Sequence, residues 1–132
     1  MPQRPYLIAK QNELPTSPRC AYASTMDVFR RVAEARQFAA DKMKKNALFA
    51  SERFFCDVYT FEPGQSQTGH RHGGSDKIYY VLEGVGDFRV DAESRTLEAG
   101  GVVFCPAGSE HAVTNPGPER LALLVFMAPP PK

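Results

Sequence analysis

The chain contains only three histidines, and two of them, His70 and His72, are separated by a single residue. On a strand both imidazoles lie on one face, with Cα atoms roughly 6–7 Å apart, close enough to bind one ion. The third, His111, follows the turn-forming segment Pro106–Gly108. Neutral imidazole binds zinc, iron, nickel and copper, and three histidines leave coordination positions open. A bare His-x-His pair is also common at the polar end of a surface strand. The spacing of the surrounding residues must therefore distinguish a metal-binding pair from such a strand end.

Length and composition predict the scaffold that holds these residues. The 132 residues suit one domain with a real core. Eleven prolines, ten glycines and no tryptophan, with short apolar runs, indicate many short strands joined by turns. A net charge of +1 gives no reason to expect a nucleic-acid or membrane partner. We therefore expect a mostly β protein that binds a small molecule.

Cysteine usage and the N-terminal sequence bear on location. Three cysteines, Cys20, Cys56 and Cys105, form no Cys-x-x-Cys pair, which favours a reducing compartment. The first residues lack the apolar core of a signal peptide, and no apolar run approaches the ~20 residues of a membrane span. We expect a cytoplasmic protein.

The pattern of apolar residues divides the chain into two parts. Residues 1–19 are proline-rich and predict an extended arm with one edge strand at 6–8; residues 25–46 show the spacing of one amphipathic helix, or of two short ones. Thus 1–47 is expected to form an N-terminal arm and helix, not an independent domain, and 48–132 a β-barrel. Periodicity near two predicts barrel strands at 53–61, 77–82, 86–90, 102–105, 111–114 and 120–127.

Two spaced motifs resemble those of the cupin family. The first runs from Gly64 through His70 and His72 to Gly84, with four residues between the second histidine and Lys77; the second contains Gly100, Pro106, Gly108, His111 and Asn115 at the family's spacing. The resemblance covers residues from about 48 to 128. It implies a double-stranded β-helix, the cupin jelly-roll barrel, with His70, His72 and His111 at its mouth, and it also implies a homodimer.

The resemblance makes Lys77 the exception, because most metal-binding cupins carry a glutamate there. An ammonium about 5 Å from a divalent ion is repelled by about 7 kcal/mol at an effective dielectric of about 20. Lys77 must therefore turn away toward an acid, be neutral, have an anion between it and the ion, or stand in a site without tight metal. A local bulge could instead present Asp76 as the carboxylate ligand. Strand alternation puts Tyr79 on the same face as Lys77.

These residues predict a metal-dependent enzyme acting on a small anionic or chelating metabolite. The three histidines would hold a divalent ion (iron, zinc, nickel or manganese), and Lys77 and Tyr79 would orient the substrate. Three-histidine sites occur in similar cupin dioxygenases, so the resemblance favours dioxygenase-like or Lewis-acid chemistry. Two alternatives stay open. The protein could be a non-catalytic cupin that binds a carboxylate, or a metal-free sugar isomerase or epimerase using a histidine and a tyrosine for proton transfer.

Overall fold

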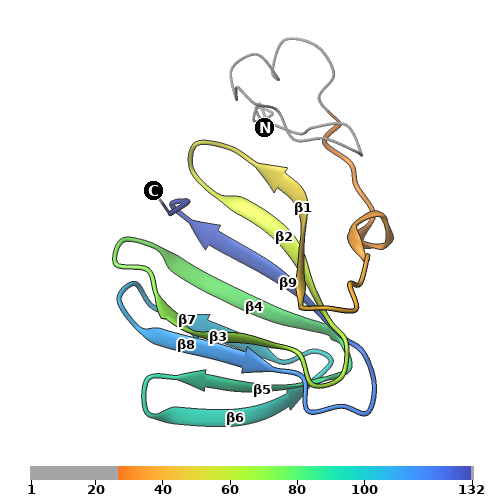
Figure 1. Ribbon diagram of the computed structural model, residues 1–132. Coiled ribbons are helices and arrows are strands. Elements are labelled where there is room, and N and C mark those ends of the chain that lie inside the picture. Colours follow the sequence, from red (N-terminus) through yellow and green to blue (C-terminus); the bar gives the residue numbers. More distant parts are fainter. Residues whose placement is uncertain (1–26, 132) are drawn as a thin grey trace.

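The computed structural model describes residues 27–131 and contains two antiparallel β-sheets, seen as two layers in Figure 1. The five-stranded sheet has the order β1-β2-β9-β4-β7 and the four-stranded sheet the order β3-β8-β5-β6. The strands are β1 (Lys44–Ala50), β2 (Phe55–Phe61), β3 (Ser66–Arg71), β4 (Asp76–Glu83), β5 (Val85–Val90), β6 (Glu93–Glu98), β7 (Val102–Cys105), β8 (Glu110–Thr114) and β9 (Leu121–Ala128). This architecture agrees with the expected double-stranded β-helix. No helix among the described residues is long and apolar enough to cross a membrane.

The main core lies between the two sheets. Strand β9 is the central strand of the larger sheet and is buried along most of its length, as its apolar sequence from Leu121 to Met127 requires. Strand β4 alternates instead, with Lys77, Tyr79 and Val81 buried and the residues between them exposed. Its buried face meets the inner face of the smaller sheet at Phe88 and Val113. The barrel interior is therefore formed by alternate residues of both sheets.

A helix was predicted over 25–46, and this prediction is wrong for the described part of that range. The structure has a single 3-10 turn, η1 (Val32–Ala35), and then strand β1, which starts at Lys44. Of the apolar residues spaced by three and four, Val32 and Ala35 pack against the outer face of the larger sheet, whereas Met43 packs against the main core and Val28 is exposed. The backbone of this segment forms hydrogen bonds with side chains of the sheet: the carbonyl of Gln37 accepts from Thr60 Oγ1 at 2.5 Å and from Asn46 Nδ2 at 3.2 Å. Tertiary contacts have overridden local periodicity.

The strand expected at residues 6–8 lies outside the described residues. Strand β1 extends across position 47, where the barrel was expected to begin. The six predicted barrel strands correspond to β2, β4, β5, β7, β8 and β9, each within two residues at either end. Strands β1 and β6 had no counterpart among the predictions, and β3 was expected only as the strand carrying the histidine pair.

The two sheets are connected directly at Gly84, the one residue between β4 and β5. Its φ of +82° lies in the left-handed region, and a Cβ there would overlap the backbone carbonyl of Arg120. Only glycine meets both requirements without displacing the backbone. Gly100 and Gly108 also have positive φ.

Candidate metal centre

Two histidines face each other across adjacent strands of the smaller sheet. His70 near the end of β3 is the register partner of His111 on β8, and their ring centroids are 4.2 Å apart. His72 follows β3 and its ring lies 4.8 Å from that of His70. The candidate ligand atoms of the three side chains all lie within 4.8 Å of one another. The structure therefore brings together the three histidines that the sequence singled out.

Backbone carbonyls fix the orientation of two of the rings. His70 Nδ1 lies 2.9 Å from the carbonyl oxygen of Thr68, and His111 Nδ1 lies 3.2 Å from that of Ser109. A carbonyl can only accept, so Nδ1 carries the proton in each neutral ring and Nε2 keeps its lone pair. Both Nε2 atoms are buried and have no hydrogen-bond partner among residues 27–131. Two buried lone pairs without a donor are what a metal ion would satisfy.

The electrostatics of the site keep the imidazoles neutral. Burial, followed by repulsion from His70 and Lys77, lowers the pKa of His111 to about 4. Burial is also the first cause that lowers the pKa of His70 and of His72 below 6.5. Metal ligation requires the unprotonated ring, so at neutral pH no proton has to be displaced.

The turn before β8 helps to position His111 and His72. Gly108 donates its N–H to the carbonyl of His72 at 2.9 Å, and Arg71 Nη1 donates to the carbonyl of Gly108 at 2.8 Å. Asp76, considered as a possible fourth ligand, lies on the exposed side of β4, where its Oδ1 accepts from the N–H of Ala107 at 2.8 Å. Its carboxylate stabilises this turn and is not part of the histidine cluster.

Lys77 points into the barrel and is only 2% exposed. Its Nζ lies 5.0 Å from the ring centroid of Tyr59 and 4.9 Å from that of Tyr79. Burial, followed by repulsion from Lys45, lowers the pKa of Lys77 to about 8. No ion pair to an acid is formed by Lys77 within the described part of the chain. Lys77 therefore does not turn outward to pair with an acid, which was one of the four arrangements expected from the sequence.

Tyr79 connects the larger sheet to the histidines. Its ring centroid is 6.1 Å from that of His111 and 5.7 Å from that of Phe88. Its hydroxyl donates to Oε1 of buried Gln67 at 2.7 Å. Burial raises the pKa of Tyr79 well above its usual range, so the phenol stays protonated. Tyr79 is thus a neutral hydroxyl held in a fixed direction by Gln67.

Two residues that the sequence reasoning did not select also belong to this interior. Gln67 was missed because a polar residue three positions before His70 carries no chemical signature of its own. Asp57 on β2 belongs to the same cross-strand row as Tyr79, with Val125 between them. Burial raises the pKa of Asp57 to about 6, while Lys45 and Lys77 oppose the shift. The alternation of β2 was the available signal, because it places Asp57 on the face of Tyr59 and Phe61.

Cys105 has a structural position rather than a reactive one. It is fully buried and unpaired, and burial raises the pKa of its thiol to about 11. Cys56, also buried and unpaired, has a pKa raised to about 12 by burial and by the carboxylate of Asp57. Cys105 therefore packs as a small buried hydrophobe.

The donor set fits a divalent transition metal. Three neutral imidazoles suit zinc, iron and nickel, and they leave coordination positions for water or substrate. His70 and His111 supply preoriented Nε2 atoms, and His72 supplies the third nitrogen. The three-histidine cluster could therefore hold a metal ion.

Two facing sheets with three histidines gathered on the inner face of one define a small barrel with a candidate metal centre. The chain belongs to the cupin family: the cupin domain matches residues 57–127, which is more than half of its length. Among solved structures, TT1209 from Thermus thermophilus has 41% sequence identity and a TM-score of 0.76, and the match covers 78% of this chain and 98% of that one.

Two curated relatives carry functional names. The oxalate-binding protein of Thermotoga maritima is 33% identical over 88 residues, covering 67% of this chain and 72% of that protein. The 5-nitrosalicylic acid 1,2-dioxygenase of a Bradyrhizobium species is 36% identical over 72 residues, covering 54% of this chain but only 34% of that enzyme. The chain therefore resembles both a ligand-binding protein and part of a dioxygenase.

Proposed function

We propose that this protein is a metal-dependent enzyme that acts on a small anionic or chelating metabolite. The observation that carries the proposal is the pair of buried Nε2 atoms of His70 and His111, which belong to one cluster with His72 and have no partner within residues 27–131. A bound divalent ion would supply Lewis acidity, or oxygen activation if the ion is ferrous iron. The similarity to part of a dioxygenase supports the second possibility.

The charges around the centre favour an anionic substrate. Three neutral imidazoles leave the full charge of a divalent ion uncompensated, and Lys77, with a pKa of about 8, is mostly protonated at pH 7. Two positive centres inside the same barrel repel each other unless an anion lies between them. We propose that Lys77 binds the negative charge of the substrate while its stem stays packed on the rings of Tyr59 and Tyr79.

Tyr79 is proposed as the second substrate-orienting residue. Its phenol remains protonated and its hydroxyl is directed by Gln67. The ring edge, which lies beside His111 and Phe88, would form one wall for a bound substrate. In this arrangement Lys77 attracts the substrate by charge and Tyr79 limits its position.

The proposal is tested by metal analysis of purified protein with matched variants. Wild type is expected to bind about one ferrous, nickel, zinc or manganese ion per chain after dialysis. His72→Ala removes a ligand outside the strand ladder and is expected to lose the ion while remaining folded. Thr68→Ala is the control, because it changes an exposed side chain of β3 and retains the carbonyl that orients His70. Failure of wild type to bind any of these ions tightly at neutral pH would overturn the proposal.

A second candidate function is non-catalytic binding of a carboxylate. The similarity to an oxalate-binding protein over 67% of the chain favours it, as does the buried ammonium of Lys77. In that case oxalate should raise the melting temperature of EDTA-treated protein, because a ligand that binds only the folded state stabilises it. The same titration on Lys77→Met should give no shift. An oxalate effect that requires metal would favour the enzyme instead.

We also propose that the protein is a homodimer. Five apolar side chains on β4, β7 and β9 are exposed on the outer face of the larger sheet, and strand pairing makes them neighbours: Ile78, Tyr80, Val102, Phe104 and Phe126. Patches of this kind mark interaction sites on soluble proteins. The free thiols of Cys56 and Cys105 support the expected reducing, cytoplasmic location.

A further inference from the structure

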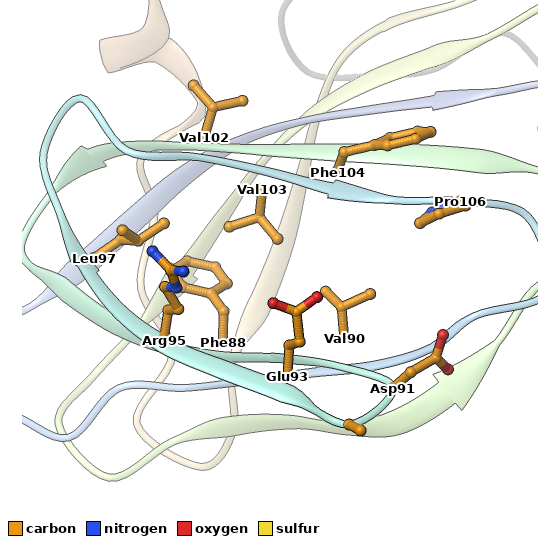
Figure 2. A pocket seen from close by; sticks show the side chains of 11 residues that line it. Phe88, Val90, Asp91, Glu93, Arg95, Leu97, Val102, Val103, Phe104 and Pro106 are labelled. Carbon is orange, nitrogen blue, oxygen red and sulfur yellow. The ribbon is translucent and has the colours of Figure 1, made fainter.

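A second feature of the barrel is a pocket of about 620 Å³ between strands β6 and β7, an edge strand of each sheet. Its apolar walls come from Phe88 and Val90 on β5, Leu97 on β6 and Val103 on β7. Figure 2 shows Glu93, Arg95 and Leu97 pointing from β6 toward β7, from which Val103 points back. The volume is in the range of ordinary small-molecule sites. It is far larger than a two-carbon acid such as oxalate needs.

Strand register connects this pocket to the histidines. His70, His111, Val90 and Glu93 are successive partners across β3, β8, β5 and β6, so they form one row on the inner face. Gln67, Val113, Phe88 and Arg95 form the next row. With strands about 4.8 Å apart, Glu93 Cα lies roughly 10 Å along the row from His111 Cα. The pocket is thus the continuation of the histidine face toward the edge of the sheet.

The pocket contains two charged groups that the fold does not use. Neither the Glu93 nor the Arg95 side chain makes a hydrogen bond or ion pair with any residue in 27–131, although other charged side chains on this sheet do, such as Arg89 with Glu110. Asp91, which also lines the pocket, has a structural role, because its Oδ1 accepts from the N–H of Glu110 at 3.0 Å. Arg95 is therefore a free planar donor at the rim of an apolar pocket, and guanidinium binds carboxylate in bidentate fashion.

We propose that this pocket receives the body of the substrate and that Arg95 binds its carboxylate at the end away from the histidines. This inference rests on the proposed metal site. The substrate class is a hydroxylated aromatic carboxylic acid: chelating oxygens lie at the metal end, an aromatic ring lies beside Phe88, and a single carboxylate reaches Arg95. Glu93, in the row of the histidines, accepts from a hydroxyl and repels a second carboxylate, which disfavours short dicarboxylates.

Two probes that differ only in the distal carboxylate test this assignment. Catechol and 3,4-dihydroxybenzoate have the same chelating end, and zinc avoids their oxidation. Binding of each to zinc-loaded protein is measured by calorimetry for wild type, Arg95→Met, Arg95→Lys and Glu93→Gln, with zinc content determined on the same samples. Arg53→Met is the matched control, because Arg53 is an exposed arginine between β1 and β2, outside the pocket.

Wild type is expected to bind 3,4-dihydroxybenzoate about 10- to 100-fold more tightly than catechol, as a charge-assisted contact implies. Arg95→Met should lose this preference with catechol affinity unchanged, Arg95→Lys should restore part of it, and Arg53→Met should retain it. Glu93→Gln should increase the preference, because the repulsion of a carboxylate is removed. Equal preference in wild type and Arg95→Met, or zinc-loaded protein that binds neither probe, overturns the inference and leaves the metal site standing. Wild type that binds no zinc overturns the inference, and wild type that binds none of ferrous, nickel, zinc and manganese ions overturns the metal site as well.

Discussion

His70 and His111 are opposed across the β3–β8 ladder with both Nδ1 atoms held by backbone carbonyls and both Nε2 atoms turned to the same space. Because the carbonyls belong to the strands themselves, ring orientation does not depend on another side chain. In metal-binding histidines generally, a hydrogen bond from the ring nitrogen that does not bind the metal fixes the tautomer. The centre is therefore preorganised by the sheet.

Replacing His111 should separate metal binding from folding. His111→Gln keeps a side chain of hydrogen-bonding groups at this buried position but removes the imidazole. Metal affinity is expected to fall by more than the ~10- to 100-fold typical of losing an outer contact of a ligand. Competition titration with a chelating dye measures the affinity, and circular dichroism checks the fold. Unchanged affinity would remove His111 from the ligand set.

Asp76 should matter for stability and not for metal. Asp76→Ala removes the acceptor for the Ala107 N–H and is expected to cost about 1 kcal/mol of unfolding free energy in urea. Asp76→Asn keeps an acceptor oxygen and should cost less. Both variants should bind one ion per chain. Loss of the ion in both would return Asp76 to the list of ligands.

Lys77 should make stability depend on pH on the alkaline side. Its pKa is about 8 in the folded protein against 10.5 ordinarily, so the unfolded chain binds more protons between these values. The contribution of Lys77 to the free energy of unfolding therefore falls as pH drops from 10.5 to 8 and is constant below pH 8. The loss is about 3 kcal/mol, and cation–π contacts offset part of it.

Lys77→Met should thus be more stable than wild type at pH 7.5, and this gain should shrink at pH 10.5. Urea unfolding of metal-free protein at both values measures it. Lys45→Met is the control, because Lys45 is exposed although its Nζ also lies over the ring of Tyr59. The same gain at both pH values would mean that packing, and not charge burial, is responsible.

The hydroxyl of Tyr79 should stabilise the fold through Gln67. Tyr79→Phe leaves the buried amide oxygen of Gln67 without its donor, which is expected to cost about 1–3 kcal/mol. Tyr80→Phe removes a hydroxyl from the next residue, on the exposed side of β4, and should cost almost nothing. Equal effects of the two substitutions in thermal unfolding would contradict the role given to Gln67.

The outer apolar face of the larger sheet should determine oligomeric state. Light scattering after size exclusion is expected to give a dimer for wild type at micromolar concentration and a monomer for Ile78→Lys, which puts a charge in the centre of that face. Val85→Lys changes an exposed apolar residue of the other sheet and should remain dimeric. A monomeric wild type would show that the expectation was wrong.

The sequence allowed the barrel strands and the histidines to be predicted because both depend on local spacing. Alternation placed Lys77 and Tyr79 on one inner face, and the two spaced motifs located His70, His72 and His111. Strand β6 was missed because its sequence, Glu93 to Glu98, is polar; it lies at the sheet edge, where only Leu97 is half-buried. The predicted helix failed because Gln37 and Asn46 are held by Thr60 of β2 rather than by a helical turn of their own.

The least predictable features involve groups that only register brings together. The backbone carbonyls of Thr68 and Ser109 hold the rings of His70 and His111. Because every residue has a backbone carbonyl, the residue type does not predict this role. The alignment of Glu93 with the histidine row likewise depends on the pairing of four strands. Such relationships follow from the sheet order, which local patterns do not encode.

The connection at Gly84 has a consequence for the proposed site. Lys77 and Tyr79 belong to one sheet and the histidines to the other, and Gly84 is the shortest link between the two. Any side chain there would push against the backbone of Arg120 and change the separation of the sheets. The distance between the buried lysine and the three histidines is therefore adjustable from a position that touches neither, so a mutation at this remote turn should change the affinity for the proposed anionic substrate.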